Sequence, residues 1–222
     1  MRNSNSVTQQ KGRRRLRLGA IARQSQGENL RKTPTRREEL LEIAAELFAA
    51  RGFASVTVDS LSAAAGVSGP ALYHHFESKE AILGEMLIDI SHHLLESGRT
   101  LREEIQPVAL LDALITMHVE FAVDHRALIS VHFHDLLQAN EADQSRVRSL
   151  QRQYLEIWVD AVLVRHPELS TPVARSAVHA TLGLINSAQF SPRARRADMV
   201  PLLQTMASSA IAACPDSVEE DV

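Results

Sequence analysis

Among the side chains that could bind a metal or transfer a proton, four histidines in the middle of the chain have the most regular spacing. His118, His125 and His132 are spaced seven residues apart, and His134 and an acidic residue follow. On one continuous helix the three evenly spaced rings would share a face, and imidazoles with a carboxylate can bind a divalent metal. The residues at 124–126 are instead typical of a helix break. We therefore favour histidines that are structural or line a polar pocket, and we expect no metal site and no cofactor.

The sequence lacks the motifs by which several enzyme classes position a catalytic group. No Gly-x-Ser-x-Gly turn, phosphate-binding loop, dinucleotide glycine turn or His-Glu-x-x-His motif occurs in the 222 residues. We expect no catalytic residues and a protein that is not an enzyme. An enzyme with a metal site among the histidines is the first alternative, and a helical adaptor that binds another protein is the second.

The stretch 57–79 has the pattern of two short helices joined by a tight turn. Thr57 can cap the first helix, Gly66 tolerates the positive φ of a turn, and Ser68 or Gly69 can cap the second helix. The apolar side chains that can form a small core between the helices are Leu61, Ala65, Val67, Leu72 and Phe76. This is the helix-turn-helix plan, in which the second helix enters the major groove of DNA.

The same stretch resembles a known family. Leu-Tyr-His-His-Phe-x-Ser-Lys-Glu-Ala over 72–81, preceded by Ala-Ala-Gly-Val-Ser over 64–68, is similar to the TetR/AcrR family of transcriptional regulators. The similarity covers residues 35–90, and beyond residue 90 only length and helical character agree. The resemblance implies an N-terminal three-helix helix-turn-helix domain followed by a helical ligand-binding and dimerisation domain.

The resemblance also implies roles for single residues. It implies phosphate contacts for Tyr73 and Lys79, and a capping residue beside phosphate for Thr57. A lysine at a helix start opposes the helix dipole, and a phosphate would offset that cost. The rings of Tyr73 and Phe76 could both belong to the core. We favour the core for Phe76 and a phosphate contact for Tyr73. Ser62 departs from the usual alanine of the family.

The start of the second helix is implied to face the bases of the groove. The residues at these positions are Ser68, Gly69, Pro70 and His74. Gly69 and Pro70 offer no long side chain for hydrogen bonds to bases. Direct readout would then depend on Ser68, Tyr73 and His74, or on apolar contact with a thymine methyl.

The beginning of the chain is strongly basic. Residues 1–37 hold eleven Lys and Arg and one acid, a charge of +10, and since the whole chain carries −3, the remainder carries −13. A basic arm on an acidic body is typical of a protein that holds a polyanion at one end. We predict a disordered arm over 1–33 whose Arg13, Arg14 and Arg15 follow the minor groove or the phosphates. A tail that adds only non-specific affinity is the alternative.

Helical periodicity accounts for the rest of the sequence, and no segment has the alternation of a strand. We predict an all-α fold of nine helices at about 35–51, 57–65, 69–76, 79–97, 107–123, 126–139, 142–166, 171–189 and 196–213. The expected domains are a helix-turn-helix domain (34–80) and a ligand-binding and dimerisation domain (81–214), followed by a flexible tail (215–222). The single cysteine and the absence of a long apolar run favour a cytoplasmic protein with no membrane partner.

The last two helices are predicted to form a dimer interface, because two copies can read a palindrome about one DNA turn apart. Their small and aliphatic residues are Ala174, Ala177, Thr181, Leu184, Ile185 and Ala188 in one helix and Leu202, Leu203, Met206, Ala210 and Ala213 in the other. Small residues permit close packing in a four-helix bundle. Packing inside one chain is the alternative.

The middle helices are predicted to enclose a ligand pocket. Its candidate lining residues are Met117, Phe121, Val131, Tyr154 and Trp158. Such a lining suits a small hydrophobic effector, for example an acyl-CoA or another lipid metabolite. The hypothesis is a homodimer that binds double-stranded DNA at a palindromic operator as a repressor, and that the effector releases by tilting the helix at 79–97.

Overall fold

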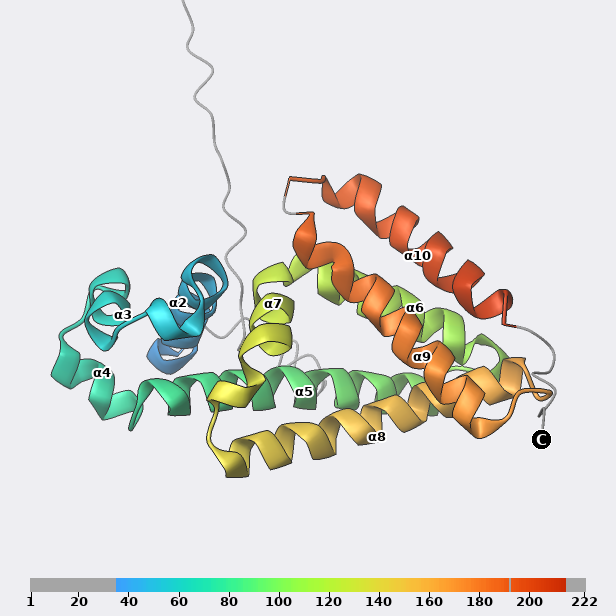
Figure 1. The fold of residues 1–222 in the computed structure, drawn as a ribbon, viewed down its shortest axis with the longest axis horizontal. Coiled ribbons are helices and arrows are strands. Elements are labelled where there is room, and N and C mark those ends of the chain that lie inside the picture. The colour runs from blue at the N-terminus through green and yellow to red at the C-terminus, as the bar shows by residue number, and fades with distance from the viewer. Residues whose placement is uncertain (1–34, 192, 215–222) are drawn as a thin grey trace, which may run out of the picture.

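The computed structural model describes residues 35–191 and 193–214, which fold into helices joined by short connections (Figure 1). The α-helices are α2 (Arg36–Arg51), α3 (Val58–Ala65), α4 (Gly69–His75), α5 (Lys79–Glu104), α6 (Pro107–Asp124), α7 (Arg126–Asp135), α8 (Glu141–Arg165), α9 (Thr171–Asn186) and α10 (Arg196–Ala212). Short 3-10 helices are η1 (Phe53–Ser55), η2 (Leu136–Gln138) and η3 (Ser187–Phe190). The described ranges contain no strand, so the predicted all-α class is confirmed.

The helices form two groups that α5 connects (Figure 1). α2, α3 and α4 lie at one end of the molecule, while α6, α8, α9 and α10 form a bundle at the other. α5 starts beside α4 and packs along α8, and α7 packs against α2. Large side chains fill the interior of both groups, among them Phe48, Met86, Leu114 and Trp158. Across the described ranges, none of the helices has both the length and the apolar character needed to cross a membrane.

Capping side chains set the beginnings of the first four helices, and the predicted caps at Thr57 and Ser68 are confirmed. The Thr35 hydroxyl accepts from the backbone N–H of Glu38, and the Glu38 carboxylate accepts from the N–H of Thr35 at 2.8 Å. The other side-chain caps are Thr57, Ser68 and Ser78, each of which accepts from the backbone N–H three residues on. α9 begins at Thr171, the predicted start, and its N-cap residue is Ser170, whose side chain makes no capping hydrogen bond.

The end of α5 differs from the prediction. The helix continues past Gly98 to Glu104, beyond the expected end at residue 97. A Cβ at Gly98 would lie 3.1 Å from Cε2 of Tyr154 on α8, so this glycine permits the close approach of two helices. Close packing, not helix termination, explains its presence. α7 and α9 are shorter than expected because each passes into a 3-10 helix.

Candidate functional site

The turn between α3 and α4 depends on Gly66. This residue has φ 65° and ψ 33°, the left-handed conformation that glycine adopts without steric cost. Its N–H donates to the Ala63 carbonyl at 3.2 Å, and the Val67 N–H donates to the Ser62 carbonyl at 3.0 Å. The predicted small core is confirmed, with half-buried Val67 beside buried Leu61, Ala65, Leu72 and Phe76. The helix-turn-helix unit is therefore held by both its turn and its core.

Ser62 is a polar residue inside this unit. It is 5% exposed, and its hydroxyl has no hydrogen-bond partner among the described residues. Because a buried hydroxyl without a partner costs about 1–3 kcal/mol, Ser62→Ala is expected to raise the free energy of unfolding by about 1 kcal/mol. Urea denaturation measures the change. Ser60→Ala is the control and should destabilise, since the Ser60 hydroxyl donates to the Thr57 carbonyl at 2.8 Å. A loss of stability in Ser62→Ala would contradict the argument.

Most of the residues of the helix-turn-helix unit that are predicted to contact DNA are exposed. Thr57, Ser68, Pro70, Tyr73 and His74 are exposed, and Gly69 is half-buried. The Tyr73 side chain is 54% exposed, so it is not a core residue. The contacts of these residues with DNA stay predictions. The predicted contacts of Arg13, Arg14 and Arg15 fall outside the described residues, as do the predicted arm and tail.

Lys79 begins α5, and its side chain folds back over η1. The ammonium donates to the carbonyl oxygens of Phe53 at 3.0 Å and Val56 at 2.9 Å. It also lies 4.1 Å from the centre of the Phe53 ring, a cation–π contact. These acceptors offset the unfavourable interaction with the helix dipole without a phosphate. The sequence pattern did not reveal these contacts. Since an ammonium has three protons, one is left for a phosphate, and that contact stays a prediction.

Two arginines that the sequence grouped with the basic arm are engaged inside the folded unit. Arg36 donates to the carbonyl oxygen of Ala65 at 2.6 Å, at the end of α3. Arg37 forms an ion pair with Glu85 of α5 through two hydrogen bonds. It also donates to the His75 carbonyl at the end of α4. These contacts hold α3, α4 and α5 to α2, so the two side chains position α4.

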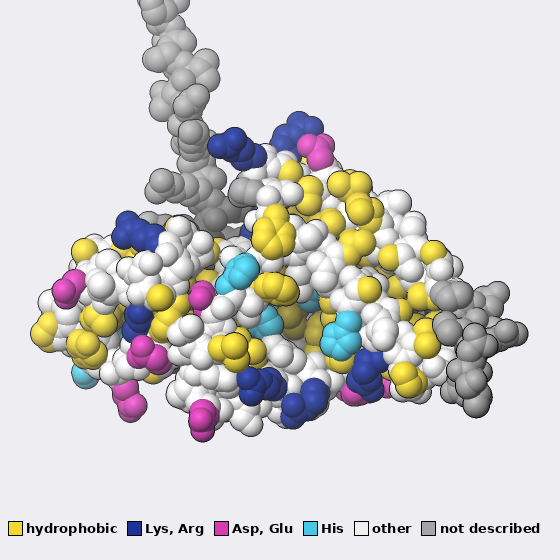
Figure 2. All heavy atoms as spheres, in the orientation of Figure 1, with side chains coloured by type: hydrophobic (Ala, Val, Ile, Leu, Met, Phe, Trp, Pro, Cys, Tyr) yellow, Lys and Arg dark blue, Asp and Glu magenta, His cyan; other side chains and the backbone are white. Residues whose placement is uncertain are grey.

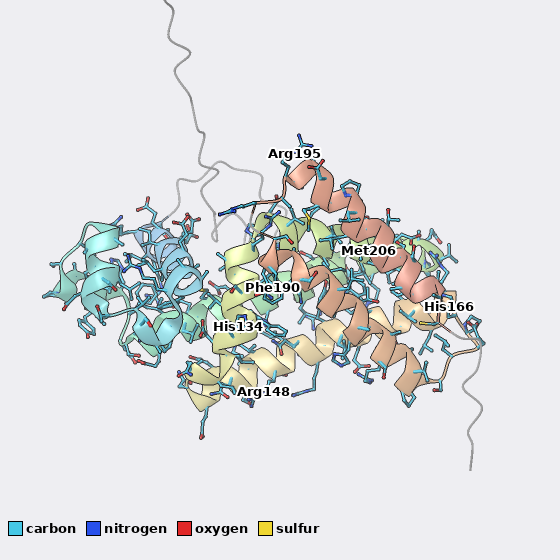
Figure 3. All side chains as sticks on the ribbon, turned by 45° about the horizontal axis from the view of Figure 1, so that its top comes forward. His134, Arg148, His166, Phe190, Arg195 and Met206 are labelled. Carbon is cyan, nitrogen blue, oxygen red and sulfur yellow. The ribbon has the colours of Figure 1, made fainter. Side chains whose placement is uncertain are left out.

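A cavity of about 440 Å³ lies between α5, α6, α7, α8 and α9. Its floor consists of buried residues, among them Ile90, Leu94, His118, Tyr154 and Leu155. Its rim consists of exposed residues, among them Phe133, Arg148, Arg152, His179 and Gly183. Figure 2 shows this hollow with histidine side chains at its edge, and Figure 3 shows Arg148 on α8, below α7. The volume is within the range of small-molecule sites, about 300–1,000 Å³.

The predicted pocket residues divide between different places. Tyr154 lines this cavity, whereas Met117 and Phe121 line a second cavity of about 750 Å³ between α5 and α6. Val131 and Trp158 line neither of the two and are packed in the core, with 1% and 0% exposure. Helical periodicity marks every inward position alike, so it could not separate packed residues from lining residues. A polar pocket was one of the two interpretations of the histidines, and His118 and His132 do line the first cavity, but periodicity did not select its other polar members, which include Ser91, Gln151 and Asn186.

Buried His118 is the centre of a polar cluster at the floor, together with buried Tyr154 and half-buried Asn186. Its Nδ1 lies 3.1 Å from the Tyr154 hydroxyl, and its Nε2 lies 3.2 Å from Oδ1 of Asn186. Desolvation lowers the pKa of His118 to about 4, and the same cause lowers the pKa of His132 to about 4. Because a neutral imidazole has one donor and one acceptor, Nε2–H donates to Asn186 and Nδ1 accepts from Tyr154. The floor is therefore polar but uncharged at neutral pH.

The lowered pKa of His118 makes a prediction about stability at acid pH. The folded-state pKa is about 4 and the ordinary value 6.5, so within this window the unfolded chain binds more protons than the folded chain. Stability is fully present above pH 6.5 and falls as the pH drops towards 4. His118→Gln is expected to reduce this loss by about 1–3 kcal/mol. Urea denaturation at neutral pH and at a pH of about 4 measures this loss of stability. His74→Gln, at an exposed position, should keep the wild-type loss; equal losses in all three proteins would contradict the prediction.

The three evenly spaced histidines do not converge. α6 ends at Asp124, and His125 has φ −123° and ψ 42°, so the predicted helix break is confirmed. His118 and His132 line the first cavity, whereas His125 lines the second. In the part of the chain that the structure describes, no group of three side chains is arranged to hold a metal ion.

α9 and α10 pack side by side and leave apolar residues on their outer surface (Figure 1, Figure 2). On α10, Leu202 and Met206 are 51% and 45% exposed. Of the other predicted interface residues, Ala210 and Ala213 are exposed, and Ala177 and Leu184 are half-buried. Other members of the predicted interface are buried within the chain: Ala174, Thr181, Ile185, Ala188 and Leu203. About half of the predicted stripe therefore packs in the core of the chain itself, and the outer half forms the surface that Figure 3 marks with Met206.

Profiles of known protein families match two segments of the chain. Residues 40–86 match "Bacterial regulatory proteins, tetR family", and residues 104–190 match "Tetracyclin repressor-like, C-terminal domain". The chain is 34% identical over 127 residues to the HTH-type transcriptional repressor KstR2 of Rhodococcus jostii (strain RHA1). That match covers 56% of this chain and 62% of the relative, which is less than two thirds of the relative's length.

Solved structures share the fold. A TetR-family transcriptional regulator from Bordetella parapertussis 12822 has a TM-score of 0.72 at 23% identity, covering 86% of this chain and 99% of that chain. The ketosteroid transcriptional regulator KstR2 of Mycobacterium tuberculosis has a TM-score of 0.71 at 24% identity, covering 82% of this chain and 95% of that chain. At these identities the likeness shows the fold alone.

Proposed function

Because the chain belongs to the TetR family of bacterial regulatory proteins, we propose that it is a ligand-responsive, DNA-binding repressor of transcription without enzymatic activity. The observation that carries the proposal is the surface of α4, where Ser68, Pro70, Tyr73 and His74 are exposed together on a capped helix-turn-helix unit. Hydroxyl, imidazole and apolar groups on such a surface can contact phosphates and base edges. A regulator of this kind acts where the DNA is, so the proposal includes the cytoplasm.

The proposal includes a homodimer on a palindromic operator. One helix of seven residues reaches only a few base pairs, so two copies related by a two-fold axis are needed for a specific site. The exposed apolar surface of α9 and α10 supports this assembly, because a second copy would bury it in a four-helix bundle. Residues 34–80 would form the DNA-binding domain and residues 81–214 the ligand-binding and dimerisation domain.

Two helices can couple the cavity to DNA binding. α5 lines the cavity with Ile90 and Leu94, and its first residue, Lys79, packs against η1 in the helix-turn-helix unit. α7 lines the cavity with Ile129 and packs against α2. An effector that binds the DNA-incompetent arrangement more tightly would shift both helices and move the two copies of α4 away from one-turn spacing.

The effector is proposed to be a small hydrophobic molecule, such as an acyl-CoA or another lipid metabolite. The apolar floor of the cavity supports this class, because such sites bind mainly by burying apolar surface. The Mycobacterium tuberculosis protein of the same fold is described as a ketosteroid regulator, which is consistent with a lipid-like effector.

A titration onto DNA tests the proposal. The purified full chain is added to a labelled duplex from upstream of its own gene and to a scrambled duplex of equal length, and fluorescence anisotropy is measured at several salt concentrations. Selective binding with a steep salt dependence is expected, since phosphate contacts release counterions. Absence of binding to either duplex at low salt would overturn the proposal and favour a protein-binding adaptor.

A further inference from the structure

The cavity between α5, α6, α7, α8 and α9 has a floor and a rim of different chemistry. The floor groups are uncharged, with His118 and Tyr154 buried and Asn186 half-buried, and two arginines lie on the rim. No carboxylate occurs among the residues that line the cavity. These two regions restrict the class of molecule that the cavity can accept. The inference rests on the proposed function in one respect, that the cavity is the effector site.

The floor offers hydrogen bonds to a neutral oxygen atom. Oδ1 of Asn186 accepts from His118, and the Tyr154 hydroxyl donates to the other ring nitrogen of His118. Asn186 is half-buried, and its amide N–H₂ makes no hydrogen bond to another of the described residues. A ligand that fills the cavity would take this amide out of water, and a ligand oxygen that accepts from it would then replace the lost hydrogen bond to water. The floor has no Lys or Arg, so a buried anion would lack a counter-charge there.

The rim offers positive charge. Arg148 and Arg152 are four residues apart on α8, so they lie on the same side of the helix, and both are exposed. Arg148 donates to the Gln144 side chain at 2.9 Å, and neither arginine has an acidic partner in the described ranges. Other arginines of the bundle are ion-paired: Arg99, Arg165, Arg175 and Arg196. Two unpaired guanidinium groups beside a cavity are suited to a carboxylate or a phosphate.

We propose that the effector is polar at both ends: a neutral oxygen, such as a hydroxyl or ketone, binds the Asn186 amide at the floor, and an anionic group binds Arg148 and Arg152 at the rim. An apolar body between the two ends fills the space lined by Ile90, Leu94 and Leu155. The anion can be a carboxylate or the phosphates of a nucleotide-linked thioester. Both present oxygen anions to the arginines, and the experiment separates them.

The test measures the affinity of matched probes for the full chain. Trp158 is the single tryptophan, and its ring lies 5.9 Å from that of His118, so its fluorescence reports on occupancy of the floor. The probes are hexadecanoate, ω-hydroxyhexadecanoate, hexadecane diol and the coenzyme A thioester of the ω-hydroxy acid. We expect ω-hydroxyhexadecanoate or its thioester to bind at least about tenfold more tightly than hexadecanoate or the diol. If ω-hydroxyhexadecanoate binds more tightly than its thioester, the anion is a carboxylate; if the thioester binds more tightly, the anion is the phosphates.

Two variants assign the contacts to residues. Arg148→Gln with Arg152→Gln is expected to weaken binding of the anionic probes about tenfold and to leave the diol unchanged. Asn186→Leu is expected to remove the advantage of the ω-hydroxyl group while the preference for an anion stays. Arg175→Gln is the matched control, because Arg175 is already paired with Glu156 outside the cavity. Binding of every probe at equal affinity, or of none, would overturn the proposal.

DNA affinity of the same variants without probe separates this proposal from the proposed function. If the chain and its variants bind DNA selectively but the arginines do not affect probe affinity, only the effector class is wrong. If the chain fails to bind DNA while probe affinity depends on both ends as stated, the ligand proposal stands and the regulatory function is wrong.

Discussion

Replacing Lys79 by methionine is expected to lower the free energy of unfolding by about 2–4 kcal/mol and to weaken DNA binding at least about tenfold. The loss of stability follows from three contacts that disappear together, namely two charge-assisted hydrogen bonds to Phe53 and Val56 and the contact with the Phe53 ring. Methionine keeps an unbranched apolar side chain but removes the ammonium donor from both carbonyls, and the Phe53 carbonyl then retains only the backbone N–H of Val56 at 3.2 Å. The loss of affinity follows because η1 and α5 position α4.

Urea denaturation and anisotropy titrations of the same variant separate the two roles of Lys79. If its remaining proton contacts a phosphate, the slope of log affinity against log salt falls by about one for each protomer. An unchanged slope would show that Lys79 acts on DNA binding only by holding the fold. Arg51→Met is the control, because Arg51 is an exposed cation at the end of α2. A loss of stability in Arg51→Met as large as that in Lys79→Met would contradict the argument.

The helix-turn-helix unit could be predicted from the sequence because its determinants are local. Thr57 and Ser68 cap helices within three residues of their partners, and the turn at Gly66 needs only its own backbone. The spacing of Leu61, Leu72 and other apolar residues then defines the small core. Local hydrogen bonds and periodicity are visible in a linear sequence, so this part of the fold needed no knowledge of the rest.

A pocket among the middle helices was predicted, and Tyr154 lines it, but the rest of its lining could not be predicted because its determinants join distant segments. His118 meets Tyr154 and Asn186, which lie 36 and 68 residues further along the chain. Their contact depends on how α6, α8 and α9 are rotated against one another, and periodicity does not contain that register. Gly98 is a second case, because it looks like a helix end in the sequence and is a packing site for Tyr154 in the structure.

Introducing glutamate at both Leu202 and Met206 is expected to convert a dimer into monomers and to weaken operator binding at least about a hundredfold. Both side chains are exposed, at 51% and 45%, so the change leaves the core of the chain intact. In a dimer through α9 and α10, however, the carboxylates would be buried against apolar residues without partners. Each monomer could then hold only one half of a palindromic operator.

Light scattering coupled to size-exclusion chromatography gives the mass, and circular dichroism verifies that the helices are retained. Leu137→Glu is the matched control, because Leu137 is 73% exposed on η2, outside α9 and α10, and should leave mass and affinity unchanged. A double variant that stays dimeric would place the interface elsewhere. A monomeric variant with full operator affinity would mean that one copy of α4 suffices for recognition. The probe titration distinguishes assembly from ligand binding, because the polar floor of the cavity lies within one chain. A monomeric variant should therefore still bind the probes. In that case its loss of DNA affinity comes from the loss of the dimer alone.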